Sequence, residues 1–555
     1  MRVADYLSNY ISSELRVKNV FMLSGTGSVY LDDAFAFQKD IKHICARHEA
    51  AAVYMAEAAA KLTGKIGVVI ATTGPGGTNA IGGIVEAWVD STPVLVISGQ
   101  VNTSQVSEGI RSFGVQGFNI IENVRNITKY AVQITDPYSI KLHLEKAIHE
   151  AYSGRPGPVW LDIPFDVQAA EININNLEGF TIESKPNLSS ERKLNEAISL
   201  IRNSEKPLVI FGQGVRNSLA IKEFEIFLET YQIPAICSRM ALDILPYDNS
   251  YFFGMGGMRG HKAPSILMRE ADTIVILGSS FTHAYAGDHY DCYNQDAKSI
   301  MVNIDNSEAT KPGLRIDISL NMDIKEFLNA SNNLSKNNDL KPSKWLQRCR
   351  YLHENLPSVD DSMAKNPINS YYFVECLNRV SKENHIFVND AGSSNYICSQ
   401  ALKLKNGQRE LTSGAFYTMG IALPLAIGAS LTEDNAQVIA ITGDGSIELN
   451  IQELRTLSQN NLDVKLFVIN NGGYASIRKS QDELVGGGRY TDDAEVLNFK
   501  NIAKAFELEF EILENYETLE LDLEKILSTK SSVLIEVVCD FKQEIIEPFN
   551  FDYTI

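Results

Sequence analysis

Short apolar runs rich in Val and Ile recur along the chain, separated by longer stretches with helical periodicity. Such runs are typical of parallel strands that helices cover on both faces of a sheet, because neither face then needs polar residues. We therefore predict repeated β–α–β units with right-handed crossovers and parallel sheets. The clearest predicted strands are residues 67–71, 94–98, 207–211, 273–277, 386–389, 438–441 and 465–469.

Two polar stretches interrupt this pattern. Residues 171–192 and 329–344 carry few apolar side chains, and the second stretch is rich in Asn, Ser and Lys. Segments of this composition have little to bury, so we predict linkers there. A chain of 555 residues is also too long for one hydrophobic core. We therefore predict an α/β protein with three doubly wound parallel-sheet domains, at residues 1–170, 190–332 and 366–545.

Composition and charge narrow the functional classes. The hydrophobic share of 44% and the charged share of 21% are those of an ordinary globular protein. A net charge of −19 argues against nucleic acid as a partner, because such binding relies on clustered Lys and Arg. Residues 1–20 read as an amphipathic helix, no apolar run approaches the ~20 residues that span a bilayer, and the seven cysteines contain no C-x-x-C pair. We expect a cytoplasmic protein without a membrane partner, a disulfide framework or a zinc site.

The most informative segment contains two turn motifs. A predicted strand ends in GDGS (443–446), a helix follows, and the next predicted strand ends in NN (470–471). Because parallel strands end at the same edge of a sheet, we expect Asp444 and Asn471 to lie close together. Their side-chain oxygens and the carbonyl of Gly473 are the kind of ligands that suit Mg²⁺.

Either motif alone is a common turn, since Asp-Gly and Asn-Gly pairs are frequent in turns. The two together, each at the end of an apolar strand with a helix between them, are more specific. This order resembles the signature of thiamine diphosphate enzymes, and residues from about 1 to 545 resemble the acetolactate synthase and pyruvate decarboxylase superfamily. The resemblance implies a pyrimidine-binding, a central and a diphosphate-binding domain. It also implies thiamine diphosphate and Mg²⁺ as cofactors, with Asp444, Asn471 and Gly473 as metal ligands.

The resemblance also assigns the cofactor contacts. The glycines of GDGS keep side chains away from the diphosphate, and the helix that follows offers N–H groups to it. Residues 413–430 resemble the stretch that carries a bulky wedge for the bent cofactor, which makes Met419 the wedge; a Met beside an apolar run is otherwise most often core filler. The expected cofactor contacts are Pro75, Asn79, Gly392, Ser393, Ser394, Thr418, Met419, Gly443, Asp444, Gly445, Ser446, Asn471, Gly473, Tyr474 and Ala475.

A carboxylate must lie beside the aminopyrimidine ring of this cofactor to favour its reactive tautomer. The segment RHEAAAVYMAEAAAKLTG resembles the family segment that carries this glutamate, so Glu49 takes the role, with Met419 and Gln116 as the other expected catalytic residues. A lone glutamate on a helix is usually structural, and Glu57 is a second candidate in the same segment. The order of motifs, with GPGGTN at 74–79 after Glu49, favours Glu49.

The implied reaction begins with loss of CO₂ from a 2-keto acid, after which the two-carbon unit is either protonated or transferred to a carbonyl group. Pyruvate decarboxylases protonate it with paired histidines in the first domain and a glutamate shortly after NN. This chain has no histidine at 107–130 and carries Ile477 at the glutamate position, whereas Gln116 matches an active-site glutamine of acetolactate synthases. We therefore predict a carboligase that decarboxylates pyruvate, or a close 2-keto acid, and transfers the two-carbon unit to a carbonyl acceptor.

Three departures from the synthase pattern bear on the ligands. Val115 and Ser480 replace a phenylalanine and a tryptophan, which widens the expected acceptor pocket, so we hypothesise a larger acceptor such as a keto-sugar. The central block follows the pattern of relatives that bind FAD, but GSSFTHAYAGD (278–288) lacks the expected Arg and paired Asp, which leaves flavin binding open. The expected substrate contacts are Val115, Gln116, Ile477, Arg478 and Ser480.

Two alternatives to the carboligase stay open. A simple 2-keto acid decarboxylase would release a free aldehyde, and a non-catalytic binding relative would keep the fold without turnover. In the family the active site lies between two subunits, so the resemblance implies a homodimer or a homotetramer. The sequence does not distinguish these two assemblies.

Overall fold

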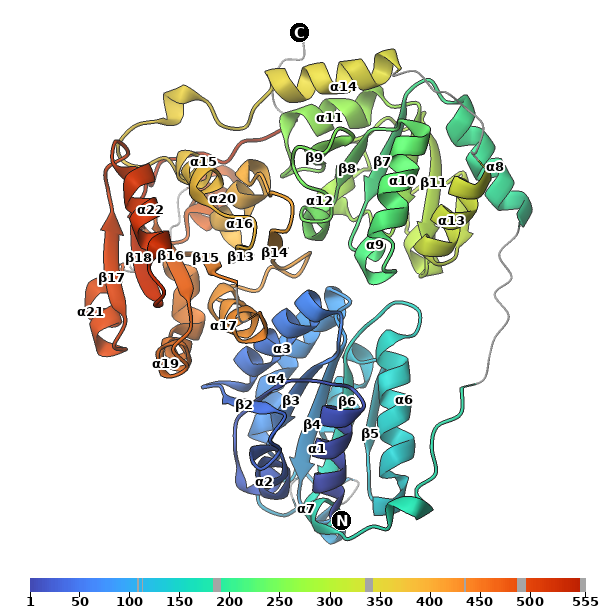
Figure 1. The fold of residues 1–555 in the computed structure, drawn as a ribbon, viewed down its shortest axis with the longest axis vertical. Helices are drawn as coiled ribbons and strands as arrows, with labels where there is room; N and C mark the ends of the chain where they lie inside the picture. Colours follow the sequence, from blue (N-terminus) through green and yellow to red (C-terminus); the bar gives the residue numbers. More distant parts are fainter. Residues whose placement is uncertain are drawn as a thin grey trace.

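The computed structural model describes residues 1–106, 109–111, 113–182, 191–334, 343–433, 436–486 and 496–549. These residues form three six-stranded sheets, in each of which the strands pair in parallel (Figure 1). The prediction of three parallel-sheet domains is confirmed. All seven predicted strands are present, four of them with the predicted bounds and three longer by one or two residues at an end.

The first sheet has the strand order β2-β1-β3-β4-β6-β5. Its strands are β1 (Asn19–Met22), β2 (Lys42–Cys45), β3 (Gly67–Ala71), β4 (Val94–Gln100), β5 (Tyr130–Gln133) and β6 (Val159–Pro164). Its helices are α1 (Val3–Ser13), α2 (Val29–Ala36), α3 (Glu49–Thr63), α4 (Pro75–Val89), α5 (Ile120–Val124), α6 (Ile140–Tyr152) and α7 (Phe165–Ala169). Helix α3 ends at Gly64, whose φ of +69° favours glycine, and α4 starts with Pro75, where a helix needs no N–H donor.

The second sheet has the order β12-β11-β10-β7-β8-β9. Its strands are β7 (Pro207–Phe211), β8 (Ala235–Cys237), β9 (Phe252–Met255), β10 (Thr273–Leu277), β11 (Lys298–Asn303) and β12 (Ile318–Asn321). Its helices are α8 (Glu191–Asn203), α9 (Gly214–Asn217), α10 (Ile221–Tyr231), α11 (Lys262–Glu270), α12 (His283–Ala286) and α13 (Ile324–Leu334). Helix α14 (Lys344–Asn355) packs on α11 of this domain.

The third sheet has the order β14-β13-β15-β16-β18-β17. Its strands are β13 (Ile386–Asn389), β14 (Arg409–Leu411), β15 (Val438–Gly443), β16 (Val464–Asn470), β17 (Glu509–Leu513) and β18 (Val533–Val538). Its helices are α15 (Ser370–Val380), α16 (Gly392–Ala401), α17 (Ala422–Thr432), α18 (Asp444–Ile447), α19 (Leu454–Gln459), α20 (Ala475–Val485), α21 (Phe499–Ala505) and α22 (Leu519–Ser528). A 3₁₀ segment, η9 (Glu448–Glu453), joins α18 to α19.

The first and third domains share one strand order. Numbered within its own domain, each sheet runs 2-1-3-4-6-5, whereas the central sheet follows another order. In both of these sheets the strand order reverses between the first and third strands. Open α/β sheets bind ligands at the carboxyl ends of the strands at such switch points. In the third domain this point lies between β13 and β15, where the predicted GDGS turn begins.

Helices α3 and α17 join the first and third domains at the centre of the molecule (Figure 1). Their buried side chains belong to one continuous apolar core that includes both sheets. The two helices approach closely at Gly428, where an added Cβ would lie 2.3 Å from the carbonyl oxygen of Met55. The two domains are therefore fixed against each other within a single chain.

The second predicted linker is wrong over its first part. Helix α13 continues to Leu334, and the buried Ser331 donates its hydroxyl to the Phe327 carbonyl at 2.8 Å. A Ser hydroxyl can bond to the preceding helical turn in this way, so a Ser- and Asn-rich composition does not exclude a helix. Residues 183–190 and 335–342 of the two predicted linkers lie outside the described part of the chain.

The predicted amino-terminal helix is shorter than the pattern suggested. Helix α1 ends at Ser13, and β1 already begins at Asn19. No helix within the described ranges is both long and apolar enough to cross a membrane.

Candidate functional site

Asp444 joins the two predicted turn motifs. It follows β15 directly and is 3% exposed. Its Oδ1 accepts the N–H of Gly445 at 2.8 Å, and its Oδ2 accepts the N–H groups of Gly473 at 2.8 Å and Asn471 at 3.1 Å. Burial raises the pKa of this carboxyl group, and the three N–H donors oppose that shift. GDGS and NN are thus parts of one site.

The oxygen atoms of this site fit a magnesium ion. A carboxylate has about four lone-pair positions, and three on Asp444 accept N–H groups, which leaves one for a cation. Asn471 donates from Nδ2 to Ser393 Oγ at 3.3 Å, so its Oδ1 is the remaining acceptor. With the Gly473 carbonyl these oxygens would be three ligands for Mg²⁺, which normally completes its coordination with phosphate oxygens and water. No cluster of three or more His, Cys, Asp or Glu suited to a metal occurs among the described residues.

Arg478 lies beside this turn, although the sequence suggested a substrate contact. Its guanidinium donates to the carbonyls of Asn471, at 3.0 Å, of Gly472 and of Gly473. The Gly473 carbonyl is therefore held by a cationic group from the chain itself. Because two cations repel each other, a metal ion bound at Gly473 requires this side chain to move.

The ring of Tyr474 covers the GDGS turn. A Cβ at Gly445 would lie 3.0 Å from the ring carbon Cζ, so a larger residue here would require the ring to shift. Tyr474 has a φ of +42° and precedes Ala475, the first residue of α20. Ser446 lies in the short helix α18, and Gly443 ends β15. The predicted contacts from both turns therefore face one another.

The predicted diphosphate contacts after β13 reach the same place. Gly392 opens α16 with a φ of +69°, and an added Cβ there would meet nothing within 4 Å. Ser394 donates its hydroxyl to the Ala391 carbonyl at 2.9 Å, which fixes the turn, and Ser393 accepts the bond from Asn471. The first turn of α16 thus lies beside the turn at residues 471–473.

The loop that carries Met419 is held from both sides. The Thr418 hydroxyl donates to Glu86 Oε2 at 2.5 Å, and Glu86 lies on α4 of the first domain. Asn450 of η9 donates to the Gly420 carbonyl at 2.9 Å. Met419 is half-buried and lies between these two hydrogen-bonded residues. Its loop is therefore tied to α4 of the first domain through Thr418 and to η9 of the third domain through Gly420.

Glu49 is buried in the first domain. It is the first residue of α3, and its Oε2 accepts the amide N–H of Asn79, in the first turns of α4, at 3.0 Å. Pro75 begins α4. The predicted pyrimidine contacts therefore come together. Glu57, the alternative carboxylate, instead forms an ion pair with Lys61 at 2.8 Å.

The loop with Val115 and Gln116 lies against the start of α4. Gln116 has a φ of +64°, and a Cβ at Gly74 would be 2.4 Å from its carbonyl oxygen. Gln100 donates to the Phe118 carbonyl at 2.7 Å and so ties the loop to β4. Val115 is 87% exposed. The predicted substrate residues of the first domain thus lie against α4, the helix whose Asn79 contacts Glu49.

The remaining predicted substrate residues lie on α20 of the third domain. Ile477 is 48% exposed, and Ser480 donates its hydroxyl to the Ser476 carbonyl at 3.1 Å. The predicted site therefore has two halves in one chain. One half surrounds Glu49 in the first domain, and the other surrounds Asp444 in the third.

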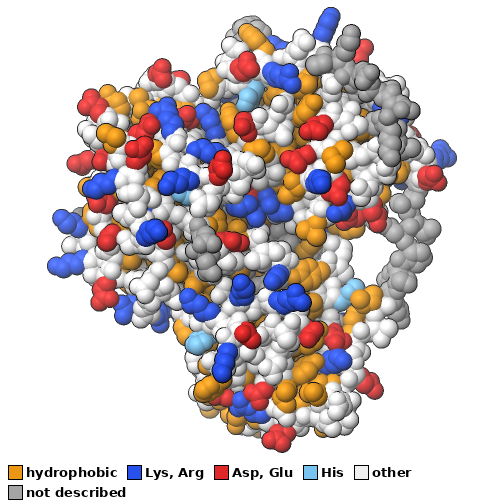
Figure 2. Space-filling model, in the orientation of Figure 1, with side chains coloured by type: hydrophobic (Ala, Val, Ile, Leu, Met, Phe, Trp, Pro, Cys, Tyr) orange, Lys and Arg blue, Asp and Glu red, His pale blue; other side chains and the backbone are white. Residues whose placement is uncertain are grey.

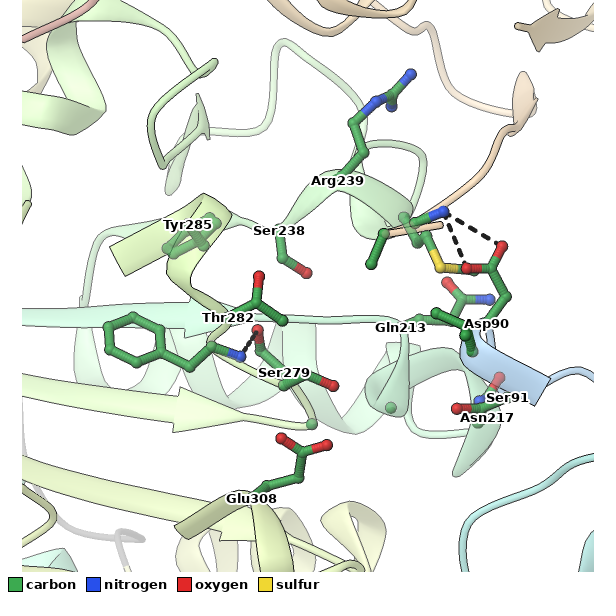
Figure 3. Close-up of a pocket in the computed structure, with 18 of the residues that line it drawn as sticks. Asp90, Ser91, Gln213, Asn217, Ser238, Arg239, Ser279, Thr282, Tyr285 and Glu308 are labelled. Atoms are coloured by element: carbon green, nitrogen blue, oxygen red, sulfur yellow. Dashed lines mark hydrogen bonds between the residues drawn. The ribbon is translucent and has the colours of Figure 1, made fainter. Parts of the chain in front are cut away.

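A cavity of about 630 Å³ lies where the three domains meet (Figure 3). It opens at the switch point of the central sheet, between the ends of β7 and β10. Gln213 and Ser279 point toward it from these two ends, and Ser238 follows β8. Residues of the segment 278–288, which departs from the pattern of flavin-binding relatives, also contribute to its walls.

The cavity walls are suited to an anionic ligand that approaches the backbone. A Cβ at Gly214 would lie 2.6 Å from the Cα of Gly278, so both turns need glycine. Gln213 Oε1 is buried without a hydrogen-bond partner among the described atoms. Basic side chains also gather in the middle of the face shown in Figure 2, and Arg155, Arg259 and Lys311 line the cavity.

Two contacts that hold the Met419 loop were not predicted from the sequence. Glu86 resembles an ordinary helical glutamate, and its partner Thr418 is 332 positions away. Asn450 lies in η9, between the GDGS turn and the helix that the sequence predicts after it. In the sequence, Glu86 stands out only as a charged residue on an otherwise apolar face of its helix. This feature does not identify Thr418 as its partner.

Comparison with known proteins supports the same assignment. The family models of thiamine pyrophosphate (thiamine diphosphate) enzymes match residues 1–125 as the N-terminal TPP binding domain, 194–331 as the central domain and 390–537 as the C-terminal TPP binding domain. The chain is 32% identical over 543 residues to the acetolactate synthase large subunit of Lactococcus lactis, covering 96% of this chain and 92% of the relative.

Two further relatives agree. The acetolactate synthase isozyme 1 large subunit of Escherichia coli is 30% identical over 546 residues, covering 98% of this chain and 94% of the relative. A probable acetolactate synthase large subunit of Methanocaldococcus jannaschii is 31% identical over 559 residues, covering 97% and 92%. The chain therefore belongs to the thiamine diphosphate-dependent enzymes, in the acetolactate synthase large-subunit family.

Proposed function

We propose that this enzyme decarboxylates pyruvate, or a close 2-keto acid, and transfers the two-carbon unit to a carbonyl acceptor. The observation that carries this proposal is the joined GDGS and NN turn around Asp444, together with the buried Glu49 bonded to Asn79, in a chain related throughout to acetolactate synthases. When bound, thiamine diphosphate supplies the nucleophilic carbon and the electron sink of the reaction. Protein residues bind and orient it and control protons.

The residues have separate tasks in this proposal. Asp444, Asn471 and the Gly473 carbonyl hold Mg²⁺, which neutralises the diphosphate. Glu49, kept in place by Asn79, shares a proton with the pyrimidine ring and favours its reactive tautomer. Met419 would pack against the cofactor, and Gln116 would contact the substrate.

We expect the two-carbon unit to be transferred and not protonated because of the residues predicted to contact the substrate. Ile477 and Val115 are apolar and offer no proton, so an aldehyde is formed only slowly. Val115 and Ser480 are smaller than the phenylalanine and the tryptophan of the synthase pattern, which leaves room for an acceptor larger than pyruvate. A keto-sugar, including one linked to a nucleotide, fits this description.

The test is incubation of the purified protein with pyruvate, thiamine diphosphate, Mg²⁺ and a panel of carbonyl acceptors, with products identified by mass spectrometry. We expect one acceptor to gain an acetyl unit. Acetaldehyde as the sole product would identify a simple decarboxylase, and acetolactate with every larger acceptor ignored would overturn the enlarged acceptor pocket.

We also propose that two copies of the chain form each active site. Glu49 and Asp444 lie in separate halves, and apolar side chains beside both halves are exposed. They are Ile110, Phe113, Val115 and Phe118 in the first domain and Phe416, Leu449 and Ile477 in the third. Exposed apolar surface of this kind is typical of subunit interfaces. We expect a dimer or tetramer in analytical ultracentrifugation, and a fully active monomer would contradict this.

For the central cavity we propose a dinucleotide of the flavin class. Support comes from its volume, the paired glycine turns at a sheet switch point and the basic side chains in its walls. The test is the visible absorbance of the purified protein and mass spectrometry of the ligand released on denaturation. A nucleotide without a flavin, such as an adenosine diphosphate, would contradict the proposal.

A further inference from the structure

We propose that Asp390 is a positioning residue for thiamine diphosphate, which holds the diphosphate turn, the Met419 loop and the metal-binding strand end in one arrangement. Asp390 follows β13 directly and is 0% exposed. The proposal rests on the thiamine diphosphate site described above and adds a residue that no motif of the sequence had marked.

The Asp390 carboxylate accepts four hydrogen bonds from three segments, which are the residue before α16, the junction between Met419 and α17, and the end of β15. Its Oδ1 accepts the N–H groups of Ala391 and Gly420, each at 2.8 Å. Its Oδ2 accepts the N–H of Ala422 and the hydroxyl of Thr442, each at 3.0 Å. A buried charge is tolerated only when it is fully paired, so each loop is drawn to the same point.

Each of the three loops carries predicted cofactor contacts. Ala391 precedes the diphosphate turn at 392–394, and Gly420 follows Met419. Thr442 lies two residues before the metal ligand Asp444. A shift of one loop therefore changes the distance between the wedge, the diphosphate contacts and the metal. Misplacement by about 1 Å can cost about 100-fold in rate.

Asp390 acts through these loops and not by direct contact. Four donors match the roughly four lone-pair positions of a carboxylate, so no position is left for a metal ion or a substrate. The main chain of the residue is also held, because its carbonyl accepts the side-chain N–H of Asn395 at 2.9 Å. Gly420 is fixed on its other side by Asn450.

The first test is Asp390→Asn, which keeps the size of the side chain but turns one acceptor into a donor that faces other donors. We expect the Kd for thiamine diphosphate in the presence of Mg²⁺, measured by titration calorimetry, to rise by about tenfold or more. At saturating cofactor, the induced circular dichroism of the bound thiamine diphosphate should also change, because the cofactor is bent differently.

A matched control is Asp272→Asn in the central domain. Asp272 also accepts a hydroxyl, from Ser204, and two backbone N–H groups, from Glu205 and Lys206 at 3.0 Å each, but it lies far along the chain from the cofactor loops. We expect this variant to bind thiamine diphosphate like the wild type.

Should Asp390→Asn fail to fold, Thr442→Val removes one of the four donors at nearly constant shape, and Thr442→Ser restores it. We expect weaker cofactor binding for Val and recovery for Ser. Wild-type affinity and an unchanged circular dichroism spectrum in both Asp390→Asn and Thr442→Val would overturn the inference. A wild-type chain that does not bind thiamine diphosphate would instead overturn the proposed function itself.

Discussion

At the scale of single residues, the environment of a carboxylate decides its role. Glu49 and Glu57 lie on the same helix and are both buried, yet Glu49 accepts a bond from a neutral amide while Glu57 pairs with Lys61. A carboxylate beside neutral donors can share a proton with a ligand, whereas one paired with a lysine is a structural ion.

The first prediction tests this difference. Glu49→Gln should lower the rate of two-carbon transfer by about 100-fold or more, because the proton partner of the cofactor is lost. Thiamine diphosphate binding, measured by calorimetry, should remain within a few-fold of the wild type. Glu57→Gln is the control and should keep its activity per bound cofactor. The opposite result would transfer the catalytic role to Glu57.

A second prediction concerns Asp162, a buried carboxyl group of β6 near the Gln116 loop. Burial raises its pKa to about 6 from 3.8, against the hydrogen bonds of Ser98, Gln133 and Gln100. Because this pKa is higher in the folded state, the folded protein binds the Asp162 proton more tightly than the unfolded chain does. The resulting contribution to the free energy of unfolding is complete below about pH 4 and is lost as the pH rises through 6.

The measurement is the free energy of unfolding in urea between pH 4 and pH 7, for the wild type and Asp162→Asn. Over this range the wild type should lose about 3 kcal/mol relative to the variant, which has no charge to bury. Parallel pH profiles of the two proteins would show that Asp162 does not titrate in this way.

At the scale of elements, close helix contacts set where side chains fit. In α4, two neighbouring glycines differ in their surroundings. A Cβ at Gly83 would lie 2.5 Å from the Cβ of Val53 in α3, whereas a Cβ at Gly82 would meet nothing within 4 Å. Helix α4 carries Pro75 and Asn79 at one end and Glu86 at the other. Its packing against α3 therefore affects both halves of the site.

The third prediction follows from this pair. Gly83→Ala should destabilise the protein by about 1–3 kcal/mol, because the added methyl group forces α3 and α4 apart. Gly82→Ala should be neutral or stabilising by up to about 1 kcal/mol, since alanine favours the helix. Urea unfolding of both variants measures this. Equal effects at the two positions would contradict the packing described.

At the scale of the whole molecule, a buried ion network fixes the first domain on the third. Lys61 of α3 lies 2.8 Å from both Glu57 and Asp90, and it donates to the Thr412 carbonyl at 3.1 Å. Asp90 in turn accepts the N–H of Gly414 at 2.9 Å. The network therefore reaches the loop that leads to Met419.

The fourth prediction is that Lys61→Met lowers the free energy of unfolding by about 3–5 kcal/mol, because two buried carboxylates lose their cation. Arg125→Met is the control. Arg125 pairs with Glu122 at the surface, and its loss should cost less than about 1 kcal/mol. Thermal unfolding followed by calorimetry compares them. A small effect of Lys61→Met would mean that water or protons already compensate the two acids.

The sequence by itself determined the strands, the fold class and the chemistry-bearing turns. Apolar runs mark buried parallel strands, and GDGS and NN directly follow two of them, so local pattern was enough to place Asp444 near Asn471. The segment with Glu49 was instead assigned by its resemblance to the family segment that carries this glutamate. The tertiary structure decided the rest. Thr418 meets Glu86 and Asp390 joins three segments only because parts of the chain that are far apart in sequence pack together. Such contacts depend on how domains and loops dock, and a local run of residues carries no information about its distant partner.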